Sequence, residues 1–146
     1  MKLKDIDFMV WDNEAKEYNK DKEVLLSSDN KIYRIHTITG ELQQLRDEFL
    51  EVELFTGFHD KNGTKIYEGD IVKCWNDNYY EDRDDPYALG STAIPLEESE
   101  KHYDFFRIRF DKELGFASVD LLPLSYILGN YDCVEVVGNI HESKDL

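Results

Sequence analysis

The stretch that decides the fold of this chain is TGFHDKNGTKIYEGDIVK, from Thr56 to Lys73. Asn62-Gly63 lies between short segments of strand-forming residues, and such a pair is the strongest short-range signal for a β-hairpin. We expect the tight turn in which both central residues adopt positive φ. Gly69-Asp70 then begins another strand, in which Ile71 and Val72 point to opposite faces. The stretch predicts an antiparallel β unit and carries no chemistry of its own.

Further segments with strand character lie on both sides of this hairpin. Between residues 103 and 110, Arg107 and Arg109 alternate with apolar residues, which predicts one apolar and one solvated face. Other strands are expected at residues 6–11, 16–18, 24–26, 31–38, 52–55, 116–119 and 133–137. Short strands at close spacing, with turn residues between them, indicate a mainly β protein built around a small barrel or roll.

The hydrophobic period changes between Glu41 and Leu50. Leu42, Leu45 and Phe49 have the spacing of one helix face, so we predict a single short helix there. The cluster of Leu and Ile residues within 120–129 indicates one further packed helical turn. We therefore expect an N-terminal α+β extension over residues 1–51 and the barrel over residues 52–146.

The segment from Asn76 to Asp104 is too long and too acidic for an ordinary loop. It holds nine acidic and two basic residues, together with Gly90 and two prolines. Its composition fits three alternatives, which are a functional loop, a disordered insertion, and a hairpin extension that carries tyrosines.

The composition restricts the classes of partner and compartment. The chain of 146 residues has 32 acidic and 17 basic residues, a formal net charge of −15. This charge argues against direct binding to nucleic acid, which needs cations to displace counterions, and against anionic membranes. Cys74 and Cys133 form no C-x-x-C pair, and no apolar leader or membrane span is visible. These features predict a cytoplasmic protein with free thiols.

The sequence contains no recognisable catalytic, cofactor-binding or metal-binding motif. It lacks a P-loop, a dinucleotide fingerprint and G-x-S-x-G, so we predict no cofactor and no enzymatic activity. A folded barrel could gather His59, Asp60 and His141, but their spacing matches no metal-ligand pattern, and surface histidines explain them more simply. We therefore predict no catalytic and no metal-ligating residues.

An aromatic set at the edge of the acidic segment is the candidate site for a partner protein. Its members are Trp75, Tyr79, Tyr80 and Tyr87. Tyr and Trp are common interface anchors, and aromatic residues line peptide grooves in SH3 domains. The alternative is that Trp75 belongs to the core and the tyrosines only hold the segment in place.

Three segments together resemble the YopX family of phage and prophage proteins. The stretch Thr56–Lys73 is similar to that family's signature, VWDNEAK (residues 10–16) to its opening strand and turn, and VEVVGNIHE (residues 134–142) to its closing strand. The resemblance implies an SH3-like small barrel behind an N-terminal extension, in the cytoplasm of a bacterial host, with no established activity. Residues 76–104 depart from the pattern like an insertion, and the ending SKDL lacks the usual proline.

These inferences leave three hypotheses for function. The first is a non-enzymatic accessory protein that binds another protein or associates with itself. The second is an acidic decoy that imitates DNA and occupies a host DNA-binding protein. The third is an enzyme of unknown reaction, which would require a pocket with convergent titratable groups.

Overall fold

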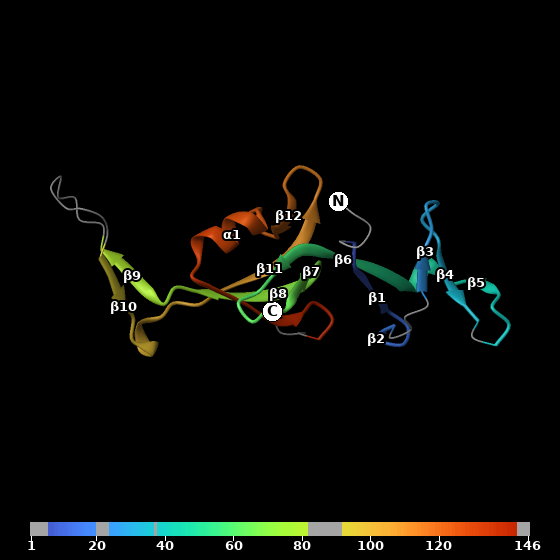
Figure 1. Ribbon diagram of the computed structural model, residues 1–146, viewed down its shortest axis with the longest axis horizontal. Coiled ribbons are helices and arrows are strands. Elements are labelled where there is room, and N and C mark those ends of the chain that lie inside the picture. The colour runs from blue at the N-terminus through green and yellow to red at the C-terminus, as the bar shows by residue number, and fades with distance from the viewer. Residues whose placement is uncertain (1–5, 20–23, 37, 82–91, 143–146) are drawn as a thin grey trace. The chain divides into compact units, whose positions relative to one another are not determined.

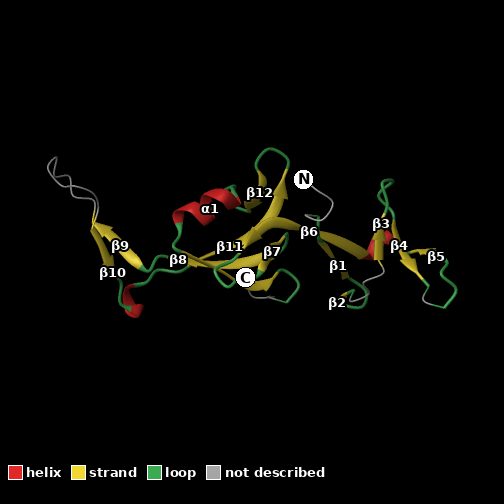
Figure 2. Ribbon diagram, in the orientation of Figure 1, coloured by secondary structure: helices red, strands yellow, loops and turns green. Residues whose placement is uncertain are grey.

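The computed structural model describes residues 6–19, 24–36, 38–81 and 92–142, and the chain divides into two compact units. The first is Met1–Leu54 and the second Phe55–Leu146, so the division falls within one long strand, β6 (Leu50–His59). Most of the regular structure consists of strands, with little helix (Figure 2). The predicted mainly β class is confirmed. No helix within the described residues is long and apolar enough to cross a bilayer.

The described part of the first unit contains antiparallel sheets of order β2-β1-β6 and β3-β4-β5 (Figure 1). Only the first half of β6 pairs with β1, from Leu50 to Leu54. Val10 and Trp11 are buried, and the ring of Trp11 meets that of Tyr18 edge-on at 4.9 Å. The elements are β1 (Phe8–Asp12), β2 (Glu17–Tyr18), β3 (Val24–Leu26), β4 (Ile32–Ile35), β5 (Leu42–Gln44) and a 3-10 helix (Asp47–Phe49).

The helix predicted over residues 41–50 is wrong for most of its length, where the structure has β5 and a loop before the short 3-10 helix Asp47–Phe49. Gly40 adopts φ of +69° and closes a turn in which the N–H of His36 donates to the carbonyl of Glu41. The chain then returns along β4 as β5, so pairing with β4 satisfies the backbone groups. Leu42 is 62% exposed, which shows that its helical spacing from Leu45 and Phe49 did not mark a buried face.

The second unit is built on a curled sheet of order β12-β11-β8-β13 (Figure 1). The second half of β6 pairs with β7, and β9 pairs with β10. A bulge in β13 shifts the register of its pairing with β8 between Val136 and Gly138. The elements are β7 (Lys65–Tyr67), β8 (Asp70–Trp75), β9 (Asn78–Glu81), β10 (Thr92–Pro95), a 3-10 helix (Glu98–Glu100), β11 (Asp104–Asp111), β12 (Gly115–Ser118), α1 (Leu124–Asn130) and β13 (Cys133–Asn139).

The core of the second unit lies between the sheet and α1, the helical turn predicted within residues 120–129. Leu124 and Ile127 of α1 are fully buried. They pack with one face of the sheet, on which the alternate residues Val72 and Cys74 of β8 point inward. The remaining buried members of this cluster are Ile66, Phe106, Ile108 and Val134.

The deciding stretch folds as a hairpin, but its turn differs from the expected one. Gly63 has φ of +79°, whereas the described non-glycine residues with positive φ are Lys16, Asn30 and Leu121, so Asn62 is not among them. The loop is longer because the Asp60 carboxylate accepts the N–H groups of Asn62 and Thr64, at 2.8 and 2.9 Å. A type I turn followed by a glycine in the left-handed region is the usual form of such a loop.

The ends of the acidic segment form a hairpin extension, one of the three alternatives for residues 76–104. Strands β9 and β10 pair with one another, and the N–H of Leu96 donates to the carbonyl of Asp77 at the base of the hairpin. Residues 82–91 lie outside the described part of the chain.

Candidate binding site

A cleft of about 390 Å³ opens in the second unit beside α1. It is formed where β8 ends and β11 begins, against α1 and the residues that flank it. The lining side chains are aromatic, amide, imidazole and carboxylate groups with one leucine, and they are Asn76, His102, Asp104, Leu122, Tyr126, Asn130 and Tyr131. Its volume falls within the range of small-molecule and side-chain pockets.

Asp104 and Tyr131 form the fixed centre of the cleft. Tyr131 follows the last turn of α1 and packs edge-on against Phe106 of β11, with ring centroids 5.9 Å apart. Its hydroxyl donates to Asp104 Oδ2 at 2.6 Å. Burial, and then the hydrogen bond to Asp104, raise the pKa of Tyr131 to about 12. The phenol therefore stays protonated at neutral pH, and Asp104 is held in place as an acceptor.

The rim of the cleft is exposed and polar. Asn76 Oδ1 accepts the N–H of Asp132 at 2.9 Å, and the Asn130 side-chain amide donates to the carbonyl of Tyr126 at 2.8 Å. These bonds orient both amide groups. Tyr126 is 54% exposed, so much of its ring is available to a ligand.

The charge of the cleft is set by Asp104. The Nε2 atom of His102 lies 3.5 Å from Asp104 Oδ1, and the His102 side chain is largely in solvent. The residues described as lining the cleft include no lysine and no arginine. Asp132 adds a second carboxylate next to Asn76. The cleft can therefore receive a group that donates hydrogen bonds or carries positive charge.

Trp75, the first residue of the predicted aromatic site, is a packed residue on the opposite face of the sheet. Its side chain is only 8% exposed, and Lys61 Nζ lies 4.2 Å from its ring centroid. Its Nε1 donates to Asp77 Oδ1 at 3.1 Å. Lys73 lies over the neighbouring ring of Tyr103 at 4.0 Å. This arrangement gives Trp75 a structural role, and its role in binding a partner stays a prediction.

The other three predicted residues are not brought together with Trp75 by any described contact. The backbone of Tyr79 and Tyr80 belongs to β9. Their side chains, and all of Tyr87, lie outside the part of the chain that the structure describes. Their role in binding stays a prediction.

Both thiols are poor nucleophiles in this fold. Cys74 is fully buried, and burial, followed by the negative charge of Asp104, raises its pKa to about 12. Burial and the bond from Cys133 Sγ to Asp77 Oδ2, at 3.1 Å, also raise the pKa of Cys133. A protonated thiol reacts slowly, because the thiolate is the reactive form.

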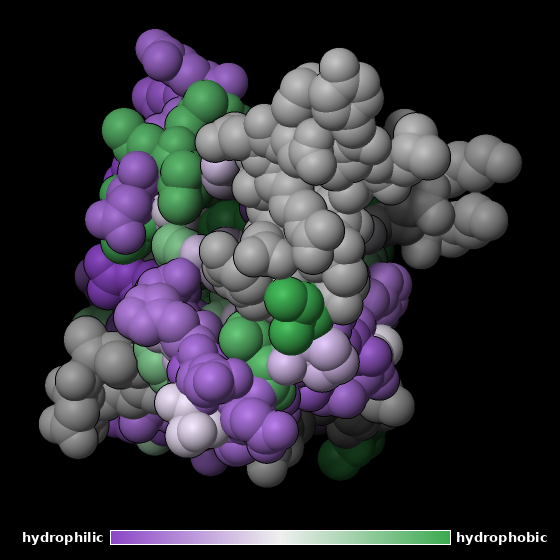
Figure 3. Space-filling model, turned by 90° about the vertical axis from the view of Figure 1, so that its left-hand side faces the viewer, coloured by the Kyte–Doolittle hydropathy of each residue, from purple (hydrophilic) through white to green (hydrophobic). Residues whose placement is uncertain are grey.

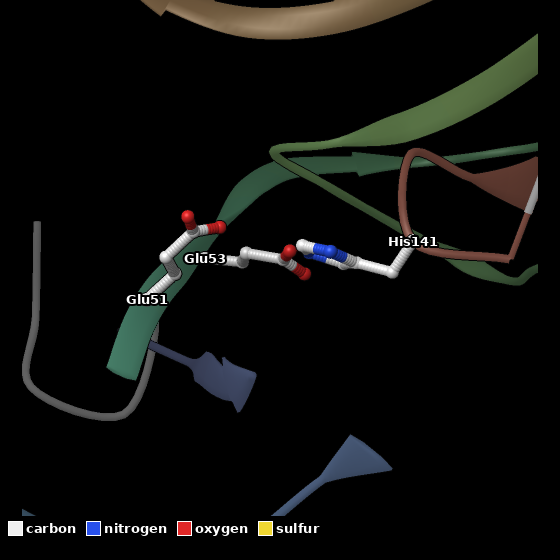
Figure 4. A group of neighbouring side chains, drawn as sticks. All are labelled: Glu51, Glu53 and His141. Carbon is white, nitrogen blue, oxygen red and sulfur yellow. The ribbon is translucent and has the colours of Figure 1, made fainter. Parts of the chain in front are cut away.

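The gathering of His59, Asp60 and His141, which the sequence analysis set aside in favour of surface histidines, is not needed to explain these residues. Asp60 accepts three backbone N–H bonds, so its carboxylate has a structural role. The N–H of His141 donates to Asn139 Oδ1 in the turn after β13. Figure 4 labels His141 together with Glu51 and Glu53. These two glutamates belong to β6 in the first unit, where Glu53 Oε2 accepts the hydroxyl of Tyr18 at 2.9 Å.

The comparisons with known proteins identify the family. A family model described as YopX protein matches residues 7–146, nearly the whole chain. The chain belongs to the YopX family. The resemblance seen in the three sequence segments is thereby confirmed. Comparison with curated proteins gives no match.

One solved structure extends the family assignment to the fold. The chain is similar to the crystal structure of protein EF1440 from Enterococcus faecalis, with a TM-score of 0.53 and 24% sequence identity. The likeness covers 94% of this chain and 94% of EF1440. At this identity it shows a shared fold and carries nothing about activity.

Sequence reasoning missed the cleft because its residues lie far apart in the chain. Asn76, His102 and Asp104 fall inside the acidic segment, for which the sequence left a functional loop, a disordered insertion and a hairpin extension as alternatives. The one local signal was the spacing of Tyr126 and Asn130, which places two polar side chains on one face of a single helical turn.

Proposed function

We propose that the chain is a non-enzymatic protein-binding module in which the cleft beside α1 receives a segment of the partner. The composition of the cleft carries this proposal. The rings of Tyr126 and Tyr131 and the side chain of Leu122 offer contact area, and oriented amides offer polar contacts. Aromatic anchors with a few fixed polar groups are typical of binding sites.

We include in this proposal that the second unit is a partly open SH3-like barrel that carries residues 76–104 as an insertion. Two backbone hydrogen bonds support the barrel, because they connect β13 and the residue that follows it to the stretch Thr56–Lys73. The N–H of Lys61 donates to the carbonyl of Val134, and that of Ile140 to the carbonyl of Gly69. SH3 domains bind extended peptides in aromatic-lined grooves, which agrees with the cleft.

The biological setting belongs to the same proposal. A phage or prophage origin and a place in the cytoplasm of the bacterial host rest on the family resemblance alone. The non-enzymatic part is supported by the two thiols, because their raised pKa values keep Cys74 and Cys133 protonated and therefore weakly nucleophilic at neutral pH.

Electrostatics favour a different partner over self-association. With a net charge of −15, two copies of the chain repel one another at low ionic strength, whereas a basic partner is attracted. On the one face that Figure 3 shows, apolar side chains of the described residues lie among hydrophilic ones.

The decoy hypothesis attributes binding to carboxylates that do not line the cleft. These carboxylates are Asp82, Asp84, Asp85, Glu97 and Glu98, of which the first three lie outside the described residues. Replacing all five by Asn or Gln separates the hypotheses. Partner binding that survives this neutralisation supports the cleft, and binding that disappears with it supports the decoy.

The direct test is partner capture with the immobilised full-length chain and two matched variants. Tyr126→Ala removes an exposed ring from the cleft, and Phe105→Ala removes a half-exposed ring from β11 that does not line it. Surface substitutions of this kind change stability by less than about 0.5 kcal/mol. We expect wild type and Phe105→Ala to retain a protein that Tyr126→Ala loses. Equal retention by all three would contradict the cleft as the binding surface.

A further inference from the structure

We propose that the cleft beside α1 binds an arginine side chain, presented by a basic segment of the partner protein. This inference rests on the proposed binding function and adds the chemical class of the ligand. It depends on three properties of the cleft, which are the remaining acceptor capacity of Asp104, the exposed ring of Tyr126 and the sign of the local charge.

Asp104 has room to accept further hydrogen bonds. Its side chain is 40% exposed, and Tyr131 occupies one position on Oδ2. A carboxylate offers about four lone-pair positions, so a planar guanidinium can still donate to it. Hydrogen bonds between a guanidinium and a carboxylate are charge-assisted and stronger than neutral ones. The bond from Tyr131 fixes the carboxylate and thereby lowers the entropy that binding costs.

The aromatic wall favours arginine over lysine. Tyr126 exposes its ring on the same side of α1 as the amide of Asn130. A guanidinium stacks on such a ring while it donates in its own plane to a carboxylate, a combination that the compact ammonium of lysine does not achieve. Leu122 offers an apolar surface to the methylene groups of the ligand side chain.

The electrostatic environment selects a cation. The described lining has Asp104 as its carboxylate and no lysine or arginine, and Asp132 lies beside Asn76 at the rim. Of the titratable groups that interact with Asp104, Tyr131 and Cys74 stay neutral, and the exposed His102 has its Nε2 3.5 Å from Asp104 Oδ1. The net charge of −15 adds long-range attraction for a basic segment and repels an acidic one. Charge therefore argues for a basic partner and against a second copy of this chain.

The test uses the full-length chain and three short peptides that differ at one position, which is arginine, citrulline or glutamate. Citrulline keeps the shape and hydrogen-bonding planarity of arginine but lacks its charge. Shifts of the backbone amide signals of Tyr126 and Asn130 in NMR titrations report binding at the cleft. We expect the arginine peptide to bind at least about tenfold more tightly than the citrulline peptide, the value of one charged hydrogen bond. The glutamate peptide should cause no shifts.

Matched variants locate the interaction. Asp104→Asn should weaken binding of the arginine peptide at least about tenfold, and Glu113→Gln, which removes an exposed carboxylate in the β11–β12 turn, should leave it unchanged. Tyr126→Ala should weaken it about fivefold without affecting the core. This variant also tests the proposal if Asp104→Asn fails to fold, because Tyr126 is exposed.

The outcomes separate this inference from the proposed function. Equal binding of the arginine and citrulline peptides, or unchanged binding by both Asp104→Asn and Tyr126→Ala, would overturn the arginine site. If partner capture still depended on Tyr126 in that case, the binding function would stand with a ligand of another class. If capture did not depend on the cleft either, the proposed function itself would be wrong.

Discussion

Asp60 shows how one side chain can hold a fold together. Its buried carboxylate accepts the N–H groups of Asn62 and Thr64 within the turn, and that of Val136 in β13 at 3.0 Å. Burial alone would raise the pKa of Asp60, but these three donors outweigh it and lower the pKa below its ordinary value. The carboxylate therefore stabilises the turn and fixes the turn to β13.

We expect Asp60→Ala to lower the free energy of unfolding by about 2–4 kcal/mol at neutral pH, because backbone donors lose a charged acceptor. Asp111→Ala is the control, since Asp111 accepts the N–H groups of Glu113 and Leu114 within its own exposed turn and faces Arg109 at 3.8 Å, but joins no second strand. Its loss should be about 1 kcal/mol or less. Chemical denaturation of the three proteins measures both values. An equal loss for both variants would contradict the special role of Asp60.

The same residue predicts the direction of the pH dependence. A carboxylate whose folded pKa is depressed contributes stability above its unfolded pKa of about 3.9, and the contribution disappears as pH falls through the folded pKa. The stability difference between wild type and Asp60→Ala should therefore be full at pH 7 and shrink below about pH 4. Denaturation curves over this range test the sign. A difference that grew on acidification would contradict the lowered pKa.

Gly63 and Gly129 form a matched pair that isolates backbone strain. An added Cβ meets no atom within 4 Å at either position, but Gly63 has φ of +79° and Gly129 lies in α1. Gly63→Val should therefore cost about 1–3 kcal/mol from strain alone. Gly129→Ala should be neutral or stabilising by up to about 1 kcal/mol, since alanine favours a helix. Thermal and chemical denaturation measure the stability of both variants relative to wild type. If Gly63→Val were as stable as wild type, the turn would have to lie elsewhere in the sequence.

At the scale of elements, local signals predicted the strands well and one helix badly. The strand at Val24–Leu26 and the start of β8 at Asp70 follow directly from turn residues beside strand-forming ones. Residues 41–50 failed because a helical spacing of leucines has meaning only where that face is buried. The turn at Gly40, which has positive φ, decides the structure instead, since it returns the chain along β4.

The β9–β10 hairpin should be removable without loss of the fold. No residue between Asn78 and Pro95 belongs to the described core cluster of the second unit. The bond from Leu96 N–H to the carbonyl of Asp77 brings the ends of the hairpin together, so Asn-Gly can replace residues 78–95. We expect circular dichroism to keep its strand signal and melting to stay cooperative, because shortening a connection costs little.

The control for this replacement is Val72→Ala in the full-length chain. Val72 is fully buried in the core, so its truncation should lower the melting temperature clearly. If the shortened chain loses cooperative unfolding while Val72→Ala keeps it, the hairpin contributes to the core, and residues 76–104 are no insertion.

At the scale of the whole molecule, the binding site could not be predicted because it is produced by packing. Asn76 and Asp132 are hydrogen-bonded across 56 positions of sequence, and Asp104 and Tyr131 across 27. No periodicity or motif links such residues, so only the pairing of β8 with β11 and β13 and the placement of α1 bring them together. Composition predicted the sign of the surface charge but not the position of a site.

The net charge of −15 gives the broadest prediction, that the chain does not bind duplex DNA at physiological salt. Non-specific DNA binding draws its free energy from counterions released by lysine and arginine. Several cations of the second unit already face carboxylates of the same chain, in the pairs Lys61–Glu135 at 3.7 Å, Lys101–Asp77 at 3.1 Å and Arg109–Asp111 at 3.8 Å. We expect no mobility shift of a random duplex at ~0.15 M salt and up to ~100 μM protein, the range of ordinary non-specific affinities.

A basic DNA-binding protein under the same conditions serves as the positive control. A shift that weakens linearly with the logarithm of salt concentration would mean that a local basic surface overrides the net charge. The outer face of β8, with Lys61 and Lys73 over aromatic rings, would then be the surface responsible. Lys73→Gln should abolish such a shift, while Lys31→Gln in the first unit should leave it unchanged. In that case the argument from charge would fail, and nucleic acid would replace a basic protein as the class of partner.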